Sequence, residues 1–135
     1  MFGAGRAEII TLPRISDARG NLTFVETGPR LPFDLRRAYW LYDVPGGESR
    51  GGHAHRHMEQ LLVAVSGSFT VVLHDGVRES KHFLNRSYYG LYIPRMMWRR
   101  LEDFSSGSVC LALVSTVYEE ADYFRSFSEF LAAVQ

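Results

Sequence analysis

The chain has 135 residues, which fits one domain with a sizeable core and is too short for two ordinary catalytic domains. Its 15 basic residues balance its 15 acidic residues without a long run of one sign, so bulk charge does not point to nucleic acid or an anionic membrane. A hydrophobic fraction of 46%, with no apolar run of roughly 20 residues and no leader-like N-terminus, predicts a folded, cytoplasmic protein.

From the N-terminus to about residue 115, short β-branched and aromatic runs alternate with Gly, Pro, Asp and Asn. This spacing is typical of a β-sandwich or a β-barrel. The predicted strands, in chain order, are residues 22–26, 37–44, 60–66, 69–73, 81–84, 89–93 and 109–117. The strongest turn signal is Asp75-Gly76, because glycine tolerates the positive φ of tight hairpins. Further turns are expected at Gly46-Gly47 and Gly67-Ser68.

The C-terminal segment changes to a helical period. Apolar side chains recur there at intervals of three and four residues, at Tyr123, Phe124, Phe127, Phe130, Leu131 and Val134. Ser126 followed by Glu129 matches a capping box. We therefore expect a short terminal helix that covers the sheet, with binding of a partner as the alternative use of this stripe. Residues 1–135 are expected to form a single domain.

The most informative stretch is a histidine cluster that follows two glycines. His53, His55 and His57 alternate with Ala54 and Arg56, just before an apolar strand. In an extended segment, alternate side chains point to the same face, so His53, His55 and possibly His57 are expected to line one cavity. Glycines beside them allow a ligand to approach the backbone closely.

The spacing around these histidines resembles the first cupin motif. His53 follows Gly47 after five intervening residues, His55 comes two positions later, and Gln60 and Gly67 follow after gaps of four and six residues. The resemblance implies a mostly β fold, namely a cupin-type jelly-roll β-barrel, here with a short C-terminal helix. Cupin metal sites take two histidines and a glutamate from this motif and a third histidine from a second motif downstream.

Two of those four metal ligands are replaced in this chain. Gln60 stands at the glutamate position, and Arg99 stands where the second motif supplies its histidine. A permanently charged guanidinium cannot ligate a cation. We therefore expect no metal and no cofactor. The alternative is a metal-dependent small-molecule cupin in which Glu59 or His57 supplies a replacement ligand.

The residue types in this region suit the movement of a carbonyl group between adjacent sugar carbons. Imidazole, with an ordinary pKa of about 6.5, accepts and returns protons near neutral pH without a metal. A phenol can hydrogen-bond a sugar oxygen or an enediolate, and Tyr39 and Tyr42 lie on the preceding strand. A diphosphate would be held by arginines, among which Arg50 and Arg99 lie nearest the predicted cavity.

Nearly the whole chain resembles the dTDP-sugar 3,4-ketoisomerases. The segments that carry the resemblance are RGGHAHRHMEQ (50–60), WRRLEDFSSGS (98–108) and YEEADYFRSF (118–127). Members are cupin-fold isomerases that convert dTDP-4-oxo-6-deoxyglucose to a 3-oxo isomer, which aminotransferases use to make 3-amino deoxysugars for surface polysaccharides. A 3,5-epimerase acting on the same substrate, or a sugar-nucleotide-binding domain without catalysis, are the competing interpretations.

The resemblance also implies roles for individual residues. It implies His53, His55 and Tyr39 as catalytic residues, without metal or cofactor. The candidate substrate-binding residues are Arg19, Tyr42, Arg50, Gln60 and Arg99. Members are homodimers that exchange N-terminal strands, which here correspond to residues from about 7 to 26 and would carry Arg19 toward the partner's site. The residue at position 99 can influence which face of the sugar is reprotonated, so the configuration at C4 of the product stays open.

Overall fold

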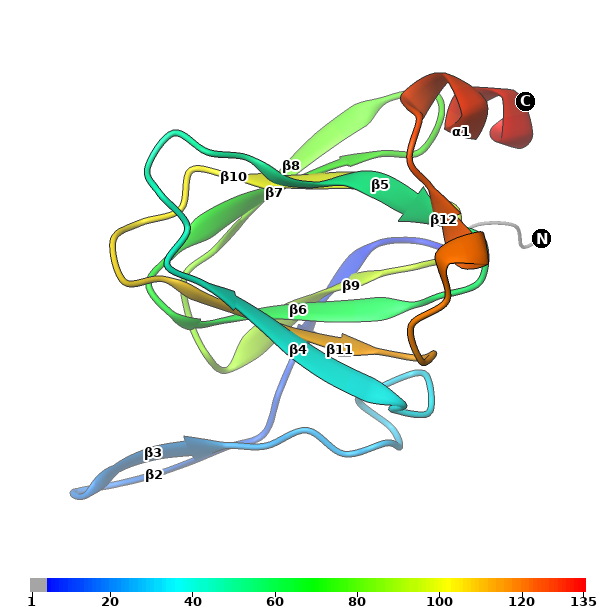
Figure 1. Cartoon of the computed structure of the whole chain (residues 1–135). Helices are drawn as coiled ribbons and strands as arrows, with labels where there is room; N and C mark the ends of the chain where they lie inside the picture. The colour runs from blue at the N-terminus through cyan, green and yellow to red at the C-terminus, as the bar shows by residue number, and fades with distance from the viewer. Residues whose placement is uncertain (1–4) are drawn as a thin grey trace.

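The computed structural model describes residues 5–135, so the first four residues of the predicted domain lie outside the described residues. Two five-stranded antiparallel sheets face each other, and a two-stranded hairpin extends away from them (Figure 1). The first sheet has the order β1-β9-β6-β11-β4, formed by Glu8–Thr11, Tyr89–Ile93, Gln60–Ser66, Val109–Val114 and Arg37–Tyr42. The second has the order β12-β5-β10-β7-β8, formed by Tyr123–Phe124, Arg50–His55, Trp98–Glu102, Phe69–His74 and Glu79–Leu84. The predicted mostly β fold class is confirmed, and the two facing sheets are compatible with a jelly roll.

The main core fills the space between the two sheets. Strand β6 turns Leu62 and Ala64 into this core, while Leu61 and Val63 point to the outer face of the first sheet. From the second sheet, β7 contributes Phe69, Val71 and Leu73, among other buried residues. Burial on both faces explains why β6 is an almost continuous apolar run instead of an alternating one.

The outer face of the first sheet carries a second apolar cluster. Leu12, Leu31 and Phe33, from the segments before β4, pack there against residues of β6 and β11. The hairpin of β2 (Arg14–Asp17) and β3 (Gly20–Thr23) does not join this packing and leaves Ile15 and Leu22 more than half exposed.

The terminal helix α1 (Phe127–Val134) packs on the second sheet beside β5 and β12 (Figure 1). Phe130 is fully buried there, in a small cluster with Ala54 and Phe124. The side chain of Ser126 accepts a hydrogen bond from the backbone N–H of Glu129, so the predicted cap is confirmed. The helix is shorter than the apolar stripe indicates, since Tyr123 and Phe124 form strand β12 instead.

Some strand boundaries differ from the predictions. β6 and β9 have the expected bounds, whereas the strand expected at residues 22–26 is β3, Gly20–Thr23, and the strand expected at 109–117 ends at Val114. The apolar pattern did not predict β1, β2, β5 or β10, because each carries polar or charged side chains that hide it. β5 was expected only as an extended segment, and β1 and β2 only through the N-terminal strands that the resemblance implies. The hairpin between β7 and β8 is confirmed, with Asp75 accepting hydrogen bonds from the backbone at Val77 and Arg78. The described part of the chain contains no helix of the length and apolarity needed to cross a membrane.

Candidate active site

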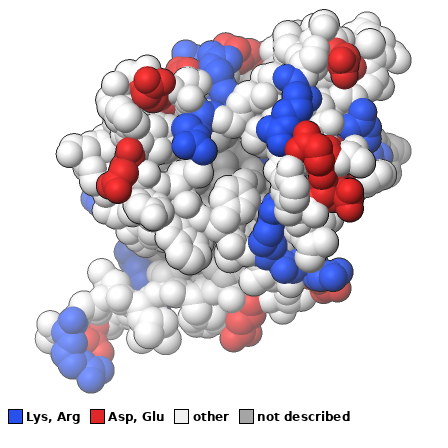
Figure 2. Space-filling view, in the orientation of Figure 1, with Lys and Arg blue, Asp and Glu red and all other residues white. Residues whose placement is uncertain are grey.

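A pocket of about 320 Å³ opens between the two sheets. We call it the histidine pocket; its lining includes Arg37, Tyr39, His53, Gln60, Arg99 and Tyr123. Further along the rim lie Arg50 and Arg125, so that four arginines line a single cavity. Figure 2 shows Lys and Arg side chains gathered around the opening between the sheets. Such a rim favours an anionic ligand.

Strand β5 brings His53 to the wall of this pocket, whereas His55 is only 1% exposed and is not among the lining residues. His53 and His55 project to the same side of the strand, and their ring centroids lie 4.8 Å apart. Ala54, between them, points the other way and packs beneath the terminal helix. The strand ends at His55, so the alternation stops there, and His57 is exposed outside the strand instead of joining the pair.

Asp122 holds the second histidine. Its Oδ2 lies 3.2 Å from Nδ1 of His55, and its carboxylate also accepts backbone N–H groups of His57 (2.7 Å) and Met58 (3.2 Å). A carboxylate that accepts in this way fixes the proton of a neutral imidazole on Nδ1. Nε2 of His55 then carries the lone pair, and it is buried without a hydrogen-bond partner among residues 5–135.

Burial and charge keep both histidines neutral. Burial, with the Arg99 guanidinium as the next cause, lowers the pKa of His53 to about 3. The same two causes lower the pKa of His55 to about 2. Both pKa values lie far below neutral pH, so both rings are unprotonated there and able to accept a proton.

The residues at the two altered ligand positions bond to each other. Nη1 of Arg99 donates to Oε1 of Gln60 (2.6 Å), and Nε2 of Gln60 donates to the phenol oxygen of Tyr39 (2.8 Å). Nη2 of Arg99 donates to the carbonyl of Met97 (2.9 Å). Burial raises the pKa of Tyr39, so the phenol keeps its proton at neutral pH.

The residues considered as replacement metal ligands lie elsewhere. Glu59 accepts a hydrogen bond from the hydroxyl of Tyr92 (2.5 Å), and His57 is exposed. Within residues 5–135, no group of three or more His, Cys, Asp and Glu side chains is placed to hold a metal ion. Arg99 brings a fixed positive charge to the position that a cupin metal ligand would occupy.

Two predicted substrate-binding residues lie outside the pocket of their own chain. Tyr42 is 61% exposed, because the alternation along β4 turns Tyr39 inward and Tyr42 outward. Arg19 lies at the tip of the hairpin, where its side chain is 91% exposed and paired with Asp17. Arg50, Gln60 and Arg99, by contrast, all line the pocket.

Sequence reasoning missed several side chains of this site. Tyr123 lies against both imidazoles, with ring centroids 4.4 Å from His55 and 5.2 Å from His53. Arg125 lies 4.0 Å over the ring of Tyr123 and is held by Glu120. These residues, like Asp122, fall in the 118–127 segment, whose composition alone carries no recognisable catalytic spacing.

The fold and the pocket define a small cupin-like protein with a histidine-containing pocket lined by four arginines. The FdtA family, described as "WxcM-like, C-terminal", matches residues 6–135, and the chain belongs to this family. It is 38% identical over 123 residues to the TDP-4-oxo-6-deoxy-alpha-D-glucose-3,4-oxoisomerase of Aneurinibacillus thermoaerophilus, covering 91% of this chain and 88% of that protein.

Solved structures agree with this assignment. A variant of the QdtA 3,4-ketoisomerase from Thermoanaerobacterium thermosaccharolyticum, in complex with TDP-4-keto-6-deoxyglucose, matches with a TM-score of 0.93 and 33% identity, over 95% of this chain and 93% of that chain. The WlaRB TDP-quinovose 3,4-ketoisomerase from Campylobacter jejuni matches with a TM-score of 0.89 and 40% identity, over 93% and 97% of the two chains.

Proposed function

We propose that the protein is a 3,4-ketoisomerase that moves the keto group of a TDP-4-oxo-6-deoxyhexose from C4 to C3, without a metal or another cofactor. The observation that carries this proposal is the neutral imidazole of His53 and the phenol of Tyr39 in the wall of one arginine-rimmed pocket, with the neutral ring of His55 in contact with His53. The activities named for the relatives are of this kind. The product would supply aminotransferases that make 3-amino deoxysugars, and we place the enzyme in the cytoplasm.

His53 is the base in this proposal, because it lies in the pocket wall. Its neutral ring takes the proton from C3, the C3–H electron pair forms a double bond to C4, and the C4 oxygen gains the negative charge. Tyr39 donates a hydrogen bond to that oxygen. Protonation at C4, with transfer of the C3 hydroxyl proton to the C4 oxygen, then gives the 3-oxo, 4-hydroxy sugar, so atoms balance without an oxidant. His55, in ring contact with His53, is the second proton carrier.

The arginines of the pocket have two roles in this proposal: they bind the diphosphate of the substrate, and they affect the pKa of His53. Arg37, Arg50 and Arg125 at the rim suit a diphosphate, since a guanidinium forms paired hydrogen bonds with phosphate oxygens. Burial is the largest cause of the low pKa of His53, and the positive charges of Arg99 and Arg125 add to it; a bound diphosphate adds negative charge that offsets this second contribution. Substrate binding would therefore raise the pKa of His53 toward the range in which imidazole is an efficient base.

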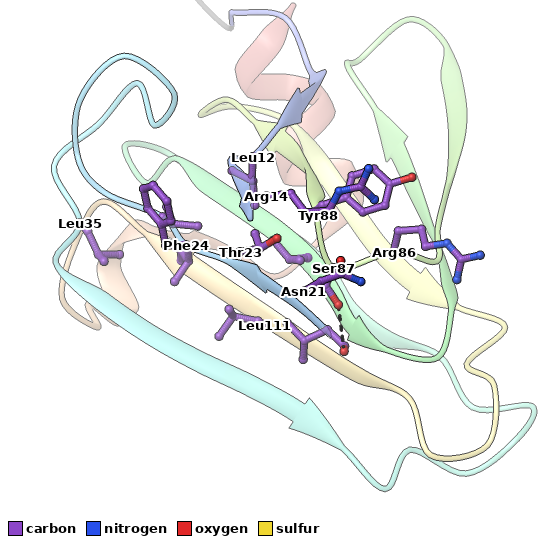
Figure 3. A pocket seen from close by; sticks show the side chains of 14 residues that line it. Leu12, Arg14, Asn21, Thr23, Phe24, Leu35, Arg86, Ser87, Tyr88 and Leu111 are labelled. Carbon is purple, nitrogen blue, oxygen red and sulfur yellow. Dashed lines mark hydrogen bonds between the residues drawn. The ribbon is translucent and has the colours of Figure 1, made fainter. Parts of the chain in front are cut away.

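We also propose a homodimer that exchanges N-terminal strands. A groove of about 550 Å³ lies between the β2–β3 hairpin and the outer face of the first sheet, and its lining includes Leu12, Phe24, Leu35 and Leu111 (Figure 3). Strand β1 pairs with β9 of the same chain, so within residues 7–26 the hairpin beyond β1 is the part free to reach a partner. Arg19 at its tip would then approach the partner's pocket.

Product analysis tests the proposed reaction. Incubation with TDP-4-oxo-6-deoxyglucose is expected to give a 3-oxo isomer, which ¹H and ¹³C NMR of the sugar ring would detect. Unchanged substrate together with tight binding in calorimetry would instead indicate a sugar-nucleotide-binding domain. A product inverted at C3 or C5 that retains its 4-oxo group would indicate an epimerase.

A further inference from the structure

We infer that Gln60 is a positioning residue that directs the phenol proton of Tyr39 into the histidine pocket. This inference rests on the proposed function, because the direction of that proton matters for an enediolate. It concerns the position at which a cupin metal site has its glutamate, and it assigns Gln60 a role other than binding the sugar directly.

Arg99 fixes the orientation of the Gln60 amide. A guanidinium has only donors, so the Gln60 atom that faces Nη1 of Arg99 at 2.6 Å must be the carbonyl oxygen. Arg99 cannot turn away readily, because it is 1% exposed and also donates to the Met97 carbonyl. The amide nitrogen of Gln60 is therefore left facing the phenol oxygen of Tyr39, at 2.8 Å.

The amide nitrogen in turn fixes the role of the phenol. Because Nε2 of Gln60 donates, the oxygen of Tyr39 must accept, and the phenol proton has to find another acceptor. Within residues 5–135 the phenol donates no hydrogen bond, and it lies in the wall of the pocket. We infer that the phenol donates this proton to an oxygen atom of the bound ligand.

A glutamate at position 60 would reverse the arrangement. Its carboxylate has only acceptor oxygens, so it would accept from Arg99 on one side and from the hydroxyl of Tyr39 on the other. The phenol proton would then point away from the ligand. The amide, unlike the carboxylate, combines an acceptor for Arg99 with a donor for Tyr39. The change from Glu to Gln at this cupin position therefore leaves the hydroxyl of Tyr39 free to donate to the ligand.

The kinetic test uses Gln60→Glu, Tyr39→Phe and the double variant. Each single change is expected to lower kcat by about 10²–10³-fold, the usual effect of losing one donor to a developing oxyanion, with KM changed by less than about threefold. In the Tyr39→Phe background, Gln60→Glu is expected to add less than about a threefold loss, because the two changes remove the same interaction. If the losses of the two single variants multiply in the double variant, the two changes act independently and the inference is overturned. A direct effect of the new carboxylate charge on His53 would give that result.

A second variant guards against a folding failure of Gln60→Glu. Gln60→Met keeps the length of the side chain but offers Tyr39 neither a donor nor a strong acceptor, so the phenol proton stays free to reach the ligand. Its kcat is expected to fall less than that of Tyr39→Phe, which lacks the donor altogether. A larger loss in Gln60→Met would contradict a role in directing the proton.

A readout without turnover separates this inference from the proposed reaction. The pKa of Tyr39, followed by ¹³C NMR of tyrosine Cζ and assigned with Tyr39→Phe, is expected to rise in Gln60→Glu, because a hydrogen bond from the neutral phenol and a nearby negative charge both oppose ionisation. An unchanged or lowered pKa would overturn the inference. If the wild type fails to isomerise the sugar nucleotide but this pKa rises, the proposed reaction fails and the hydrogen-bond chain stands.

Discussion

At the scale of single residues, the site combines a buried cation with two neutral imidazoles. Arg99 is 1% exposed and donates hydrogen bonds to the carbonyl oxygens of Gln60 and Met97, while its Nε has no partner within residues 5–135. Its positive charge contributes, after burial, to the low pKa values of His53 and His55. A positive charge beside a base keeps the base unprotonated before the substrate arrives. The same charge later favours the negative oxygen of an enediolate.

The carboxylate of Asp122 is expected to set the tautomer of His55. ¹⁵N NMR of the wild type should show a neutral ring protonated at Nδ1, and Asp122→Asn should give a mixture of tautomers, because its side chain can also donate through its amide. We expect kcat to fall by about tenfold or more in this variant. An Nε2-protonated ring in the wild type would contradict the role of Asp122.

The low histidine pKa values also make stability depend on pH. Between the folded pKa of His53, about 3, and its unfolded value of 6.5, the unfolded chain binds one more proton, so the stabilising contribution is complete above pH 6.5 and is lost as the pH falls toward 3. The slope for each such histidine is at most about 1.4 kcal/mol per pH unit. The free energy of unfolding, measured with urea from pH 7 to 4.5, should therefore fall less steeply with decreasing pH in His53→Asn than in the wild type. The same pH dependence in both proteins would contradict the lowered pKa of His53.

The part of the site that could be predicted from the sequence is the part with a local pattern. His53, Gln60 and Arg99 follow cupin spacing, and their meeting in one pocket agrees with it. Asp122 has no such pattern, since it reaches His55 across 67 positions through the turn before β12. The direction of Tyr42 depends on which face of an edge strand is covered, which the sequence of β4 does not show.

At the scale of elements, strands could be predicted where burial decides their sequence. β6 and β9 lie inside the first sheet and read as apolar runs, whereas β10 reads Trp-Arg-Arg-Leu-Glu. Its charged residues are compensated by contacts from other elements: Arg99 bonds to Gln60, and Arg100 pairs with Glu79. Such long-range pairing leaves no local signature, so a functional strand looked like a loop.

Gly67, in the turn between β6 and β7, is expected to be intolerant of a side chain. It has φ +66, and a Cβ there would lie 2.5 Å from Oγ of Ser105 and 2.8 Å from Cα of Ser108. Gly107 provides a matched control, with φ +72 and nothing within 4 Å of an added Cβ. Urea unfolding should show a loss of about 1–2 kcal/mol in Gly107→Ala from backbone conformation alone. Gly67→Ala should lose about 1–3 kcal/mol more through the clash, and equal losses would contradict this account.

At the scale of the whole molecule, two facing sheets and a covering helix follow from strand content and helical period, but the position of the hairpin does not. Nothing in the sequence of β2 and β3 distinguishes a hairpin folded back on its own sheet from one that reaches outward. Ile15 and Leu22 are paired across the hairpin, and their side chains are 59% and 56% exposed in the single chain. The hairpin faces the groove through Arg14, Asn21 and Thr23, so Ile15 and Leu22 form a separate exposed apolar pair on its other face, and such a pair indicates an interaction surface.

The proposed dimer is expected to depend on that pair. Replacing Ile15 and Leu22 together by Asp should convert a dimer to a monomer in sedimentation or light scattering, because two buried charges oppose the contact. Val77→Asp is the control, since Val77 is 82% exposed in the β7–β8 turn and lies outside the β2–β3 hairpin. A wild-type protein that sediments as a monomer, or a double variant that stays dimeric, would contradict the proposed exchange of N-terminal strands.

The most direct measurement of the central claim, metal-free acid–base catalysis at His53, is turnover by enzyme stripped with a chelator and checked for residual metal. In D₂O, the stripped enzyme should convert TDP-4-oxo-6-deoxyglucose at an undiminished rate, with deuterium in the product at C4, while His53→Asn should be slower by roughly two or more orders of magnitude. An activity that disappears on stripping and returns only with added metal, or a His53→Asn variant of near-normal rate, would contradict the claim.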